Sequence, residues 1–322
     1  MPARAPRHAT LLASLAVVLA SVLTGCTDDG ASTREDTAAA SGSDSAATGS
    51  STGSAAGSGS GSGSGLAAAD LTAISDDPLV AQAVVDYQNY VRAEVDQLLI
   101  DTKIFTDAVR AGDLEAAKAA YAPSRVHWET IEPIAGLIEE IDGAVDARVD
   151  DFASVTDPAW TGWHRLEYLL FDQGTTEGAA PFADKLDADL VTLHTQIQTL
   201  QIPPGAVAIG AAELIEEVSE GKITGEEDRY SRIDLWDFAA NVDGADRVVQ
   251  SLAPALALRD AELLRTVDAG IAEIRAGLEP YRDGAGWKPY TALTDADRQR
   301  LQAQLAALAE QLSAIPGVLE LT

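Results

Sequence analysis

The 322-residue chain is poor in cysteine, with Cys26 as its single copy, and poor in basic residues. A single cysteine excludes an intramolecular disulfide framework. Only 22 lysines and arginines stand against 51 aspartates and glutamates, which gives a formal net charge of −29. Because binding to nucleic-acid phosphates requires clustered basic side chains, nucleic acid is not an expected partner. The acidity is typical of a protein that is soluble outside the cell, and its negative field would concentrate cations nearby.

Runs of alternating β-branched residues are also missing, so we expect an all-α fold. Asp77-Pro78 is a helix start signal, and Pro203-Pro204-Gly205 separates two halves with about four helical segments each. This pattern is typical of one or two antiparallel bundles, and we expect two four-helix bundles in a duplicated, bilobal domain. The helices are expected over residues 79–109, 114–141 with interruptions at Pro123 and Pro133, from Asp157-Pro158 onward, and over 184–200, 207–219, 228–252, 257–278 and up to Leu312.

The first residues look like a leader and not like part of the fold. Arg4 and Arg7 precede an apolar run over residues 11–22, which is too short to span a membrane as a mature helix. The run ends in Leu23-Thr24-Gly25-Cys26, which resembles the lipobox of bacterial lipoproteins. An ordinary secretory signal that happens to end in cysteine is the alternative.

We therefore expect residues 1–26 to be a lipoprotein signal peptide with lipidation at Cys26. Residues 27–66, rich in serine and glycine, are expected to be a flexible tether. The rest of the chain, residues 67–322, would then be a helical domain outside the cytoplasm, held at the outer face of the cell membrane by lipid alone.

An imidazole and a carboxylate stand three residues apart in TGWHRLEYLLF, residues 161–171. Positions i and i+3 lie on one helix face, so His164 and Glu167 can reach the same point. The surrounding side chains are apolar, and a charge among them requires a partner. A metal ion uses both a neutral imidazole nitrogen and a carboxylate oxygen, although His164 alone could be a satisfied core histidine.

Glu129 and Glu132 form a second pair with the same spacing. Two carboxylates that close repel each other unless a cation or a proton lies between them, although the pair alone could be a solvated face. Ferritin-like di-iron sites are built similarly from facing helices, and this donor set suits iron or manganese, with zinc also suitable. We expect His127 to be structural and assign no role to His194. A following loop supplies further carboxylates: Asp142, Asp146, Asp150 and Asp151.

The segment GWHRLE, residues 162–167, matches the Gly-x-His-x-x-Glu signature of imelysin-like proteins, once grouped with metallopeptidases. The chain resembles the EfeO/EfeM branch of that family more closely. The resemblance covers the chain from about residue 71 to its end. It depends on HWETIEP at 127–133, GEEDRYS at 225–231, DLWDF at 234–238 and NVDG at 241–244.

The resemblance implies an iron-binding component of the Efe iron uptake system, which works outside the cytoplasm with a membrane permease and a haem-dependent peroxidase. It implies a pair of four-helix bundles with iron as the bound ion, and with manganese, zinc or copper as alternatives. The implied ligands are Glu129, Glu132, Asp146, His164 and Glu167, with Asp146 the one for which neighbouring carboxylates compete. Glu226-Glu227-Asp228 is either a second cation site or a helix start enriched in acid.

Many EfeO proteins carry a cupredoxin-like domain, and here only the serine-glycine tether stands in that region, so we expect the short, EfeM-type form and a monomer. An enzyme is not expected. In metallopeptidases the motif His-Glu-x-x-His supplies two metal-binding histidines and a general-base glutamate, and the helix with His164 lacks this motif. The alternatives left open are a metallopeptidase that uses Glu129 or Glu132 as its base, and a polysaccharide or surface-binding module stabilised by a metal.

Overall fold

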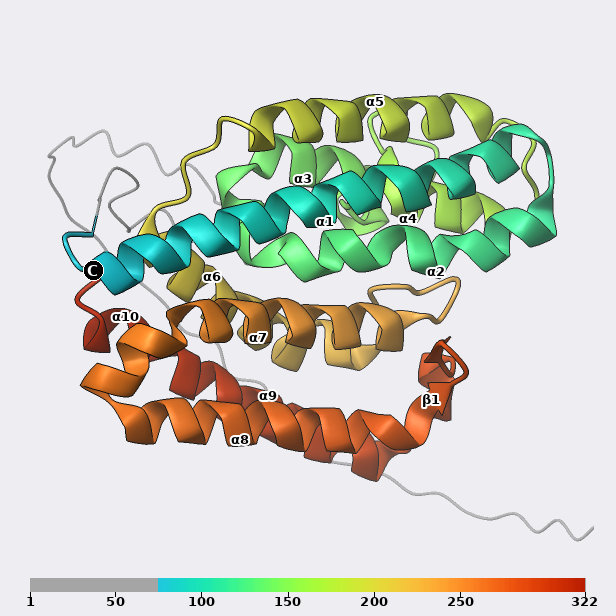
Figure 1. The fold of residues 1–322 in the computed structure, drawn as a ribbon. Helices are drawn as coiled ribbons and strands as arrows, with labels where there is room; N and C mark the ends of the chain where they lie inside the picture. The colour runs from blue at the N-terminus through green and yellow to red at the C-terminus, as the bar shows by residue number, and fades with distance from the viewer. Residues whose placement is uncertain (1–74, 322) are drawn as a thin grey trace, which may run out of the picture. The chain divides into compact units, whose positions relative to one another are not determined.

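The computed structural model describes residues 75–321, which form an all-α fold as predicted (Figure 1). The expected signal peptide, the lipidation site Cys26 and the expected tether all lie outside the described residues. Within the described part, no helix is both long enough and apolar enough to cross a membrane.

Three long helices and several short ones make up the first half of the described chain. The long helix α1 packs against α2 and α5, and the short elements connect α2 to α5. The elements are α1 (Pro78–Arg110), α2 (Leu114–Ile131), η2 (Glu132–Leu137), α3 (Glu139–Val145), η3 (Val149–Asp151), α4 (Gly162–Glu167), η4 (Tyr168–Asp172) and α5 (Ala180–Ile197).

Four long helices dominate the second half, where α6 packs on α7 and α9, and α8 lies between α7 and α9. The two short strands pair antiparallel at the turn expected near residues 283–286. The elements are α6 (Pro204–Glu220), η5 (Lys222–Thr224), α7 (Asp234–Arg259), α8 (Ala261–Leu278), η6 (Glu279–Tyr281), β1 (Arg282–Asp283), β2 (Gly286–Trp287), η7 (Tyr290–Ala292), α9 (Asp295–Ser313) and α10 (Ile315–Val318).

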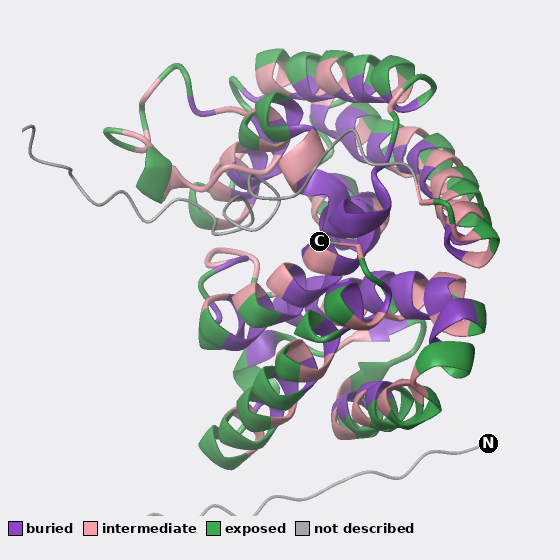
Figure 2. Cartoon of the chain, turned by 90° about the vertical axis from the view of Figure 1, so that its left-hand side faces the viewer, coloured by how far each residue is buried: buried purple, intermediate pink, exposed green. Residues whose placement is uncertain are grey.

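The two halves share one continuous apolar core. Helix α7 packs on α1 and α2, and α6 packs on η2. Buried residues lie on the sides of the helices that face one another (Figure 2). The division near residues 203–205 therefore falls in a connection between two groups of helices that bury each other's faces, and an internal duplication stays a prediction.

The sequence signals explain where α1 and α9 begin. The Asp77 carboxylate accepts the N–H of Leu79 at 2.8 Å and caps α1. A capping box of Thr294 and Asp297 is present at the start of α9. In α1 the buried side of the helix repeats at the expected spacing through Val80, Ala83, Tyr87, Val91, Val95 and Leu98.

Two predicted helix starts are wrong. The helix with His164 begins at Gly162, because the Asp157 carboxylate accepts the N–H of Ala159 at 2.9 Å within a turn and does not cap a helix. Helix α7 begins at Asp234 and not at residue 228, because Arg232 has a left-handed backbone with φ of 64°, which interrupts any helix.

Prolines also act differently from the prediction. Helix α2 continues through Pro123 and ends at Ile131, directly before Glu132 and Pro133, so only the second proline coincides with a break. Helix α7 continues through Pro254 to Arg259, beyond its predicted end at residue 252.

Candidate metal centre

The start of α4 is pressed against the end of α3, and this contact brings His164 beside Asp146. Gly162 has φ of +82°, and a Cβ atom there would lie 2.1 Å from the carbonyl oxygen of Val145. Only glycine satisfies both conditions. As a result the Nε2 atom of His164 lies 3.5 Å from Oδ1 of Asp146, the residue that follows α3.

Glu167 lies one turn after His164 and orients the imidazole. Its Oε2 atom is 3.2 Å from Nδ1 of His164. Its other oxygen, Oε1, accepts the backbone N–H groups of Tyr230 at 2.9 Å and Ser231 at 2.7 Å, and the Ser231 hydroxyl at 2.9 Å. The predicted pair is therefore confirmed as a buried contact, and it is tied to the second half of the chain.

The second half also contributes two acidic side chains to this place. Glu227 Oε1 lies 3.6 Å from His164 Nε2. Ligand atoms of Asp146, His164 and Glu227 lie within 4.8 Å of one another, and so do those of His164, Glu167 and Asp228. We call these five residues the His164 group. Although it is buried, the Nε2 atom of His164 has no hydrogen-bond partner among residues 75–321.

Asp146 is held by donors from α2. The indole Nε1 of Trp128 donates to Asp146 Oδ2 at 3.0 Å, and the Arg125 guanidinium donates to Oδ1. Burial alone would raise the pKa of Asp146, but Arg125 and His164 lower it below its ordinary value, so the carboxylate is ionised.

Arg125 is a fully buried cation at the centre of these acids. Its guanidinium pairs with Glu129, one helical turn away, and lies 3.5 Å from Asp237 of α7. It also lies 5.7 Å from the centre of the Trp163 ring. The sequence interpretation missed Arg125, because an arginine next to a glutamate at i+4 is usual on any solvated helix.

Glu129 and Glu132, the other predicted ligands, are both buried and bound to a lysine. The ammonium Nζ of Lys222 lies 3.0 Å from Glu129 Oε2 and 2.8 Å from both oxygens of Glu132. The amide of Asn241 donates to the same two carboxylates, at 3.0 Å to Glu129 Oε2 and 2.7 Å to Glu132 Oε2. The cation that this pair requires is supplied here by Lys222. Burial alone would lower the pKa of Lys222, but Glu129 and Glu132 raise it well above its ordinary value.

The protonation of the His164 group follows from burial and from its neighbours. Burial and Arg125 lower the pKa of His164, but the contact of Nδ1 with Glu167 and the nearby carboxylates of Glu227 and Asp146 outweigh them and raise it to about 9. Burial would raise the pKa of Glu227, but Lys222, His164 and Arg148 hold it well below its ordinary range. With this pKa the imidazole is protonated at neutral pH, so a metal ion that binds Nε2 would displace a proton.

Residues 83–315 match the imelysin family, which also carries the designation Peptidase_M75. The chain belongs to the imelysin family. This chain is 51% identical over 240 residues to the iron uptake system component EfeO of Escherichia coli O157:H7. The aligned region covers 74% of this chain and 64% of that protein. Identity to the EfeO components of Escherichia coli K12 and Shigella flexneri is 50% over the same length. The chain therefore spans a little under two thirds of these relatives.

Within this imelysin-like fold, the loop carboxylates expected to compete with Asp146 lie elsewhere. Asp150 pairs with Arg229 on the surface, Asp151 is exposed, and Asp142 is half-buried. No contact joins any of the three to His164 among the interactions of the described residues.

The two other histidines among residues 75–321 lie apart from His164. His127 pairs with Glu94 and lies 3.3 Å from Asp101, between α1 and α2. His194 lies at the surface, 3.0 Å from Asp96. Neither approaches the His164 group.

Residues 226–228 were expected to form a separate site or a simple helix start, and neither description fits the structure. Glu227 and Asp228 join the His164 group, and Glu226 is exposed. Asp237 and Asn241, also missed as site residues, lie in segments on which the resemblance to the EfeO/EfeM branch depends, and that was the one signal that could have found them.

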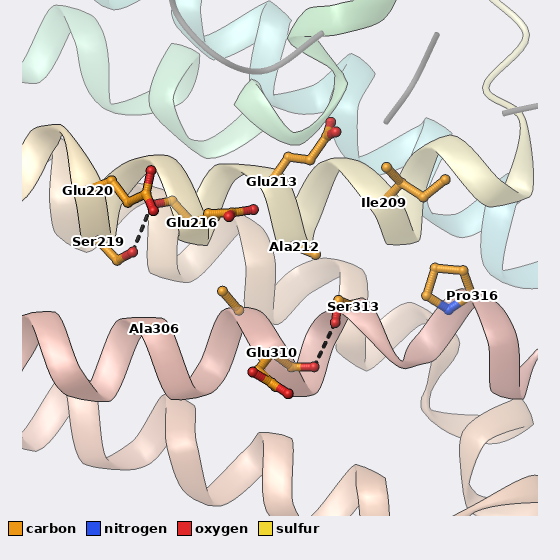
Figure 3. A pocket seen from close by; sticks show the side chains of 11 residues that line it. Ile209, Ala212, Glu213, Glu216, Ser219, Glu220, Ala306, Glu310, Ser313 and Pro316 are labelled. Atoms are coloured by element: carbon orange, nitrogen blue, oxygen red, sulfur yellow. Dashed lines mark hydrogen bonds between the residues drawn. The ribbon is translucent and has the colours of Figure 1, made fainter. Parts of the chain in front are cut away.

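A second acidic place lies between α6 and the helices α9 and α10 (Figure 3). Its hydroxyl groups are engaged, because Ser219 and Ser313 each donate to a backbone carbonyl three residues earlier at 2.8 Å. No histidine or cysteine lines this pocket, and we assign it no function. The acidic residues that line it are Glu213, Glu216, Glu220 and Glu310.

Proposed function

We propose that this protein captures iron ions outside the cytoplasm and delivers them to a membrane permease of the Efe type. The observation that carries the proposal is the unpartnered, buried Nε2 atom of His164 among the carboxylates of Asp146, Glu167, Glu227 and Asp228. An imidazole nitrogen without a partner in a ring of acids is the donor arrangement that a transition-metal ion uses.

The spacing of the donor atoms supports an ion at this place. Ligand atoms about 2.0–2.2 Å from one metal ion lie about 3–4 Å from each other. His164 Nε2 lies 3.5 Å from Asp146 Oδ1 and 3.6 Å from Glu227 Oε1, too far for hydrogen bonds and suitable for sharing an ion. Nitrogen and oxygen donors without sulfur suit iron, manganese, zinc and copper, and among these the relatives' role in iron uptake favours iron.

The charge balance also favours a cation as cargo. The buried cations of the cluster are Arg125, Lys222 and the protonated His164, and they face a larger number of carboxyl groups. The buried acids are Glu129, Glu132, Asp146, Glu167, Glu227, Asp228, Asp234 and Asp237. Because ligands must lose their protons to bind metal, we expect binding to weaken in acid, which offers one route to release.

Delivery depends on the parts of the chain outside residues 75–321. Lipidation at Cys26 and the tether up to residue 66 would hold the helical domain at the outer face of the cell membrane. The relatives are named as components of an iron uptake system. Within such a system we propose an Efe-type permease as the recipient and a haem peroxidase as a further partner. We expect the protein to act as a monomer in this system.

A metallopeptidase is the second candidate, because the family also carries a peptidase designation. Glu129 and Glu132 are its only proposed bases, and both are occupied by Lys222 and Asn241. Digestion of casein with added zinc or manganese separates the two functions, since chelator-sensitive cleavage would support the peptidase. A polysaccharide-binding role has less support, because Trp128, Trp160 and Trp163 are fully buried and Trp236 and Trp287 are partly buried.

The site is tested by the double variant His164→Ala/Glu167→Ala, titrated with Fe²⁺ without oxygen and with Fe³⁺. We expect at least about a hundredfold loss of affinity, because the variant loses the one nitrogen donor and a carboxylate. His194→Ala is the matched control, since this histidine pairs only with Asp96 at the surface. Wild-type affinity in the double variant would overturn the assignment.

A further inference from the structure

Lys222 occupies the place between two carboxylates where sequence reasoning expected a metal ion. Its Nζ atom makes three contacts of 3.0 Å or less to Glu129 and Glu132, and the residue is 3% exposed. Asn241 adds two donors to the same pair. The carboxylate pair is thus saturated by groups of the protein itself, and no external ion is needed to balance its repulsion.

The backbone around Lys222 fixes the ammonium in this place. Lys222 begins the short turn η5, which ends at Gly225 in a left-handed conformation with φ of 80°. The Tyr290 ring covers Gly225 so closely that a Cβ atom would lie 2.2 Å from it, and the Tyr290 hydroxyl donates to the carbonyl of Ile223 at 2.6 Å. These contacts hold the backbone of Lys222 in one conformation, in which its side chain is buried.

One carboxylate connects the ammonium to the His164 group. Glu227 Oε1 lies 3.8 Å from Lys222 Nζ and 3.6 Å from His164 Nε2. A cation held by His164 and Glu227 therefore has the ammonium as a near neighbour of like charge, and in a buried place such repulsion is weakly screened.

We propose that Lys222 sets the capacity and affinity of the metal centre by acting as a built-in cation, which holds Glu129 and Glu132 and restricts the imported ion to the His164 group. This inference rests on the proposed function only for the identity of the imported ion, which is iron. The position of the Lys222 ammonium between Glu129 and Glu132 does not depend on that function. A neutral residue at position 222 would remove the ammonium from Glu129 and Glu132, and although Asn241 would still donate to both, two adjacent carboxylates without a cation are the beginning of a second cation site.

The test is metal titration of Lys222→Met, which removes the ammonium and keeps the rest of the unbranched side chain at nearly the same length. Lys185→Met is the matched control, because Lys185 pairs with Asp189 on the surface of α5 and its loss changes the net charge equally. With Mn²⁺ and with Fe²⁺ in the absence of oxygen, we expect one ion per chain for wild type and control. We expect Lys222→Met to bind a second ion, or to bind the first more than about threefold tighter. One ion with an affinity within that range of wild type would overturn the proposal.

Because Lys222→Met leaves buried carboxylates unpaired, it could fail to fold, and Glu132→Gln is therefore measured beside it. Glu132 contacts Lys222 and Asn241 and no member of the His164 group. If the ammonium holds Glu132, the variant binds one ion with an affinity within about threefold of wild type. A larger loss would show that Glu132 binds the ion, against the proposal. If the wild-type protein does not bind iron, the proposed function is refuted. The role of Lys222 would still be supported if Lys222→Met binds more Mn²⁺ than wild type, or binds it more tightly.

Discussion

The imidazole of His164 and the carboxylate of Glu227 face each other at 3.6 Å, although they belong to opposite halves of the chain. Glu227 follows η5, and its second oxygen, Oε2, accepts a hydrogen bond from the Arg148 guanidinium at 2.9 Å. This bond orients the carboxylate so that Oε1 faces His164. An ion bound between His164 and Glu227 would join the two groups of helices. The candidate metal centre therefore depends on the contact between the two groups of helices and not on either group alone.

Glu227→Gln tests whether the second half supplies a ligand. We expect iron affinity to fall about 10–100-fold, because an amide replaces a charged oxygen donor that faces His164. Titration of metal-free protein measures the change. Glu226→Gln is the control, since Glu226 is the exposed neighbour and should bind as wild type does. Equal affinities for the two variants would exclude Glu227 from the site.

Much of the first-half site could be predicted because it is local in sequence. The spacing of His164 and Glu167, and of Glu129 and Glu132, gives shared helix faces without knowledge of the fold. The helix periodicity likewise predicted most of α1, α6, α8 and α9.

The second-half residues could not be found in this way, because their approach depends on tertiary packing. The acids at 226–228 resemble an ordinary helix start, and only the left-handed Arg232 and the turn before α7 bring Glu227 and Asp228 inward. Lys222 was missed for a related reason. A lysine is normally exposed, and its burial is acceptable only because Glu129 and Glu132 surround it.

Asp142 makes the stability of the metal-free protein depend on pH. Burial and the nearby Asp146 carboxylate raise its pKa from 3.8 to about 7. Because the folded pKa exceeds the unfolded one, the unfolded chain ionises first, and the free energy of unfolding falls as pH rises from about 4 to 7. Asp142→Asn has no carboxyl group to ionise and therefore does not lose this stability. The difference in the free energy of unfolding between the variant and wild type should favour the variant more at pH 8 than at pH 5, by an amount of order 1–2 kcal/mol.

Thermal unfolding with chelator present measures this difference, which corresponds to a few degrees in Tm. Asp151→Asn serves as the control, because Asp151 is exposed and its replacement should shift Tm equally at both pH values. An Asp142→Asn shift that does not change with pH would contradict the interpretation.

Cys26→Ser tests the expected anchor. If Cys26 carries the lipid, the variant should move from the membrane fraction to the soluble extracytoplasmic fraction, because in our proposal the lipid holds the protein at the membrane. Immunoblotting of fractionated cells gives the distribution. Thr27→Ser is a suitable control, since it changes the neighbouring residue and leaves the thiol intact. Unchanged membrane association of Cys26→Ser would refute lipidation as the anchor.

Gly162→Ala should damage the metal centre without touching a ligand. A Cβ atom at Gly162 would lie 2.1 Å from the Val145 carbonyl oxygen, and φ of +82° is unfavourable for alanine, so α4 must shift away from α3. We expect a loss of about 2–4 kcal/mol in stability and a weaker affinity for iron, since His164 and Asp146 are held together by that contact. Gly143→Ala in α3 is the control, because no atom lies within 4 Å of its Cβ position, and alanine there should stabilise the helix slightly. Thermal unfolding and titration of both variants check the prediction, and equal behaviour would show that the α3–α4 contact does not position the site.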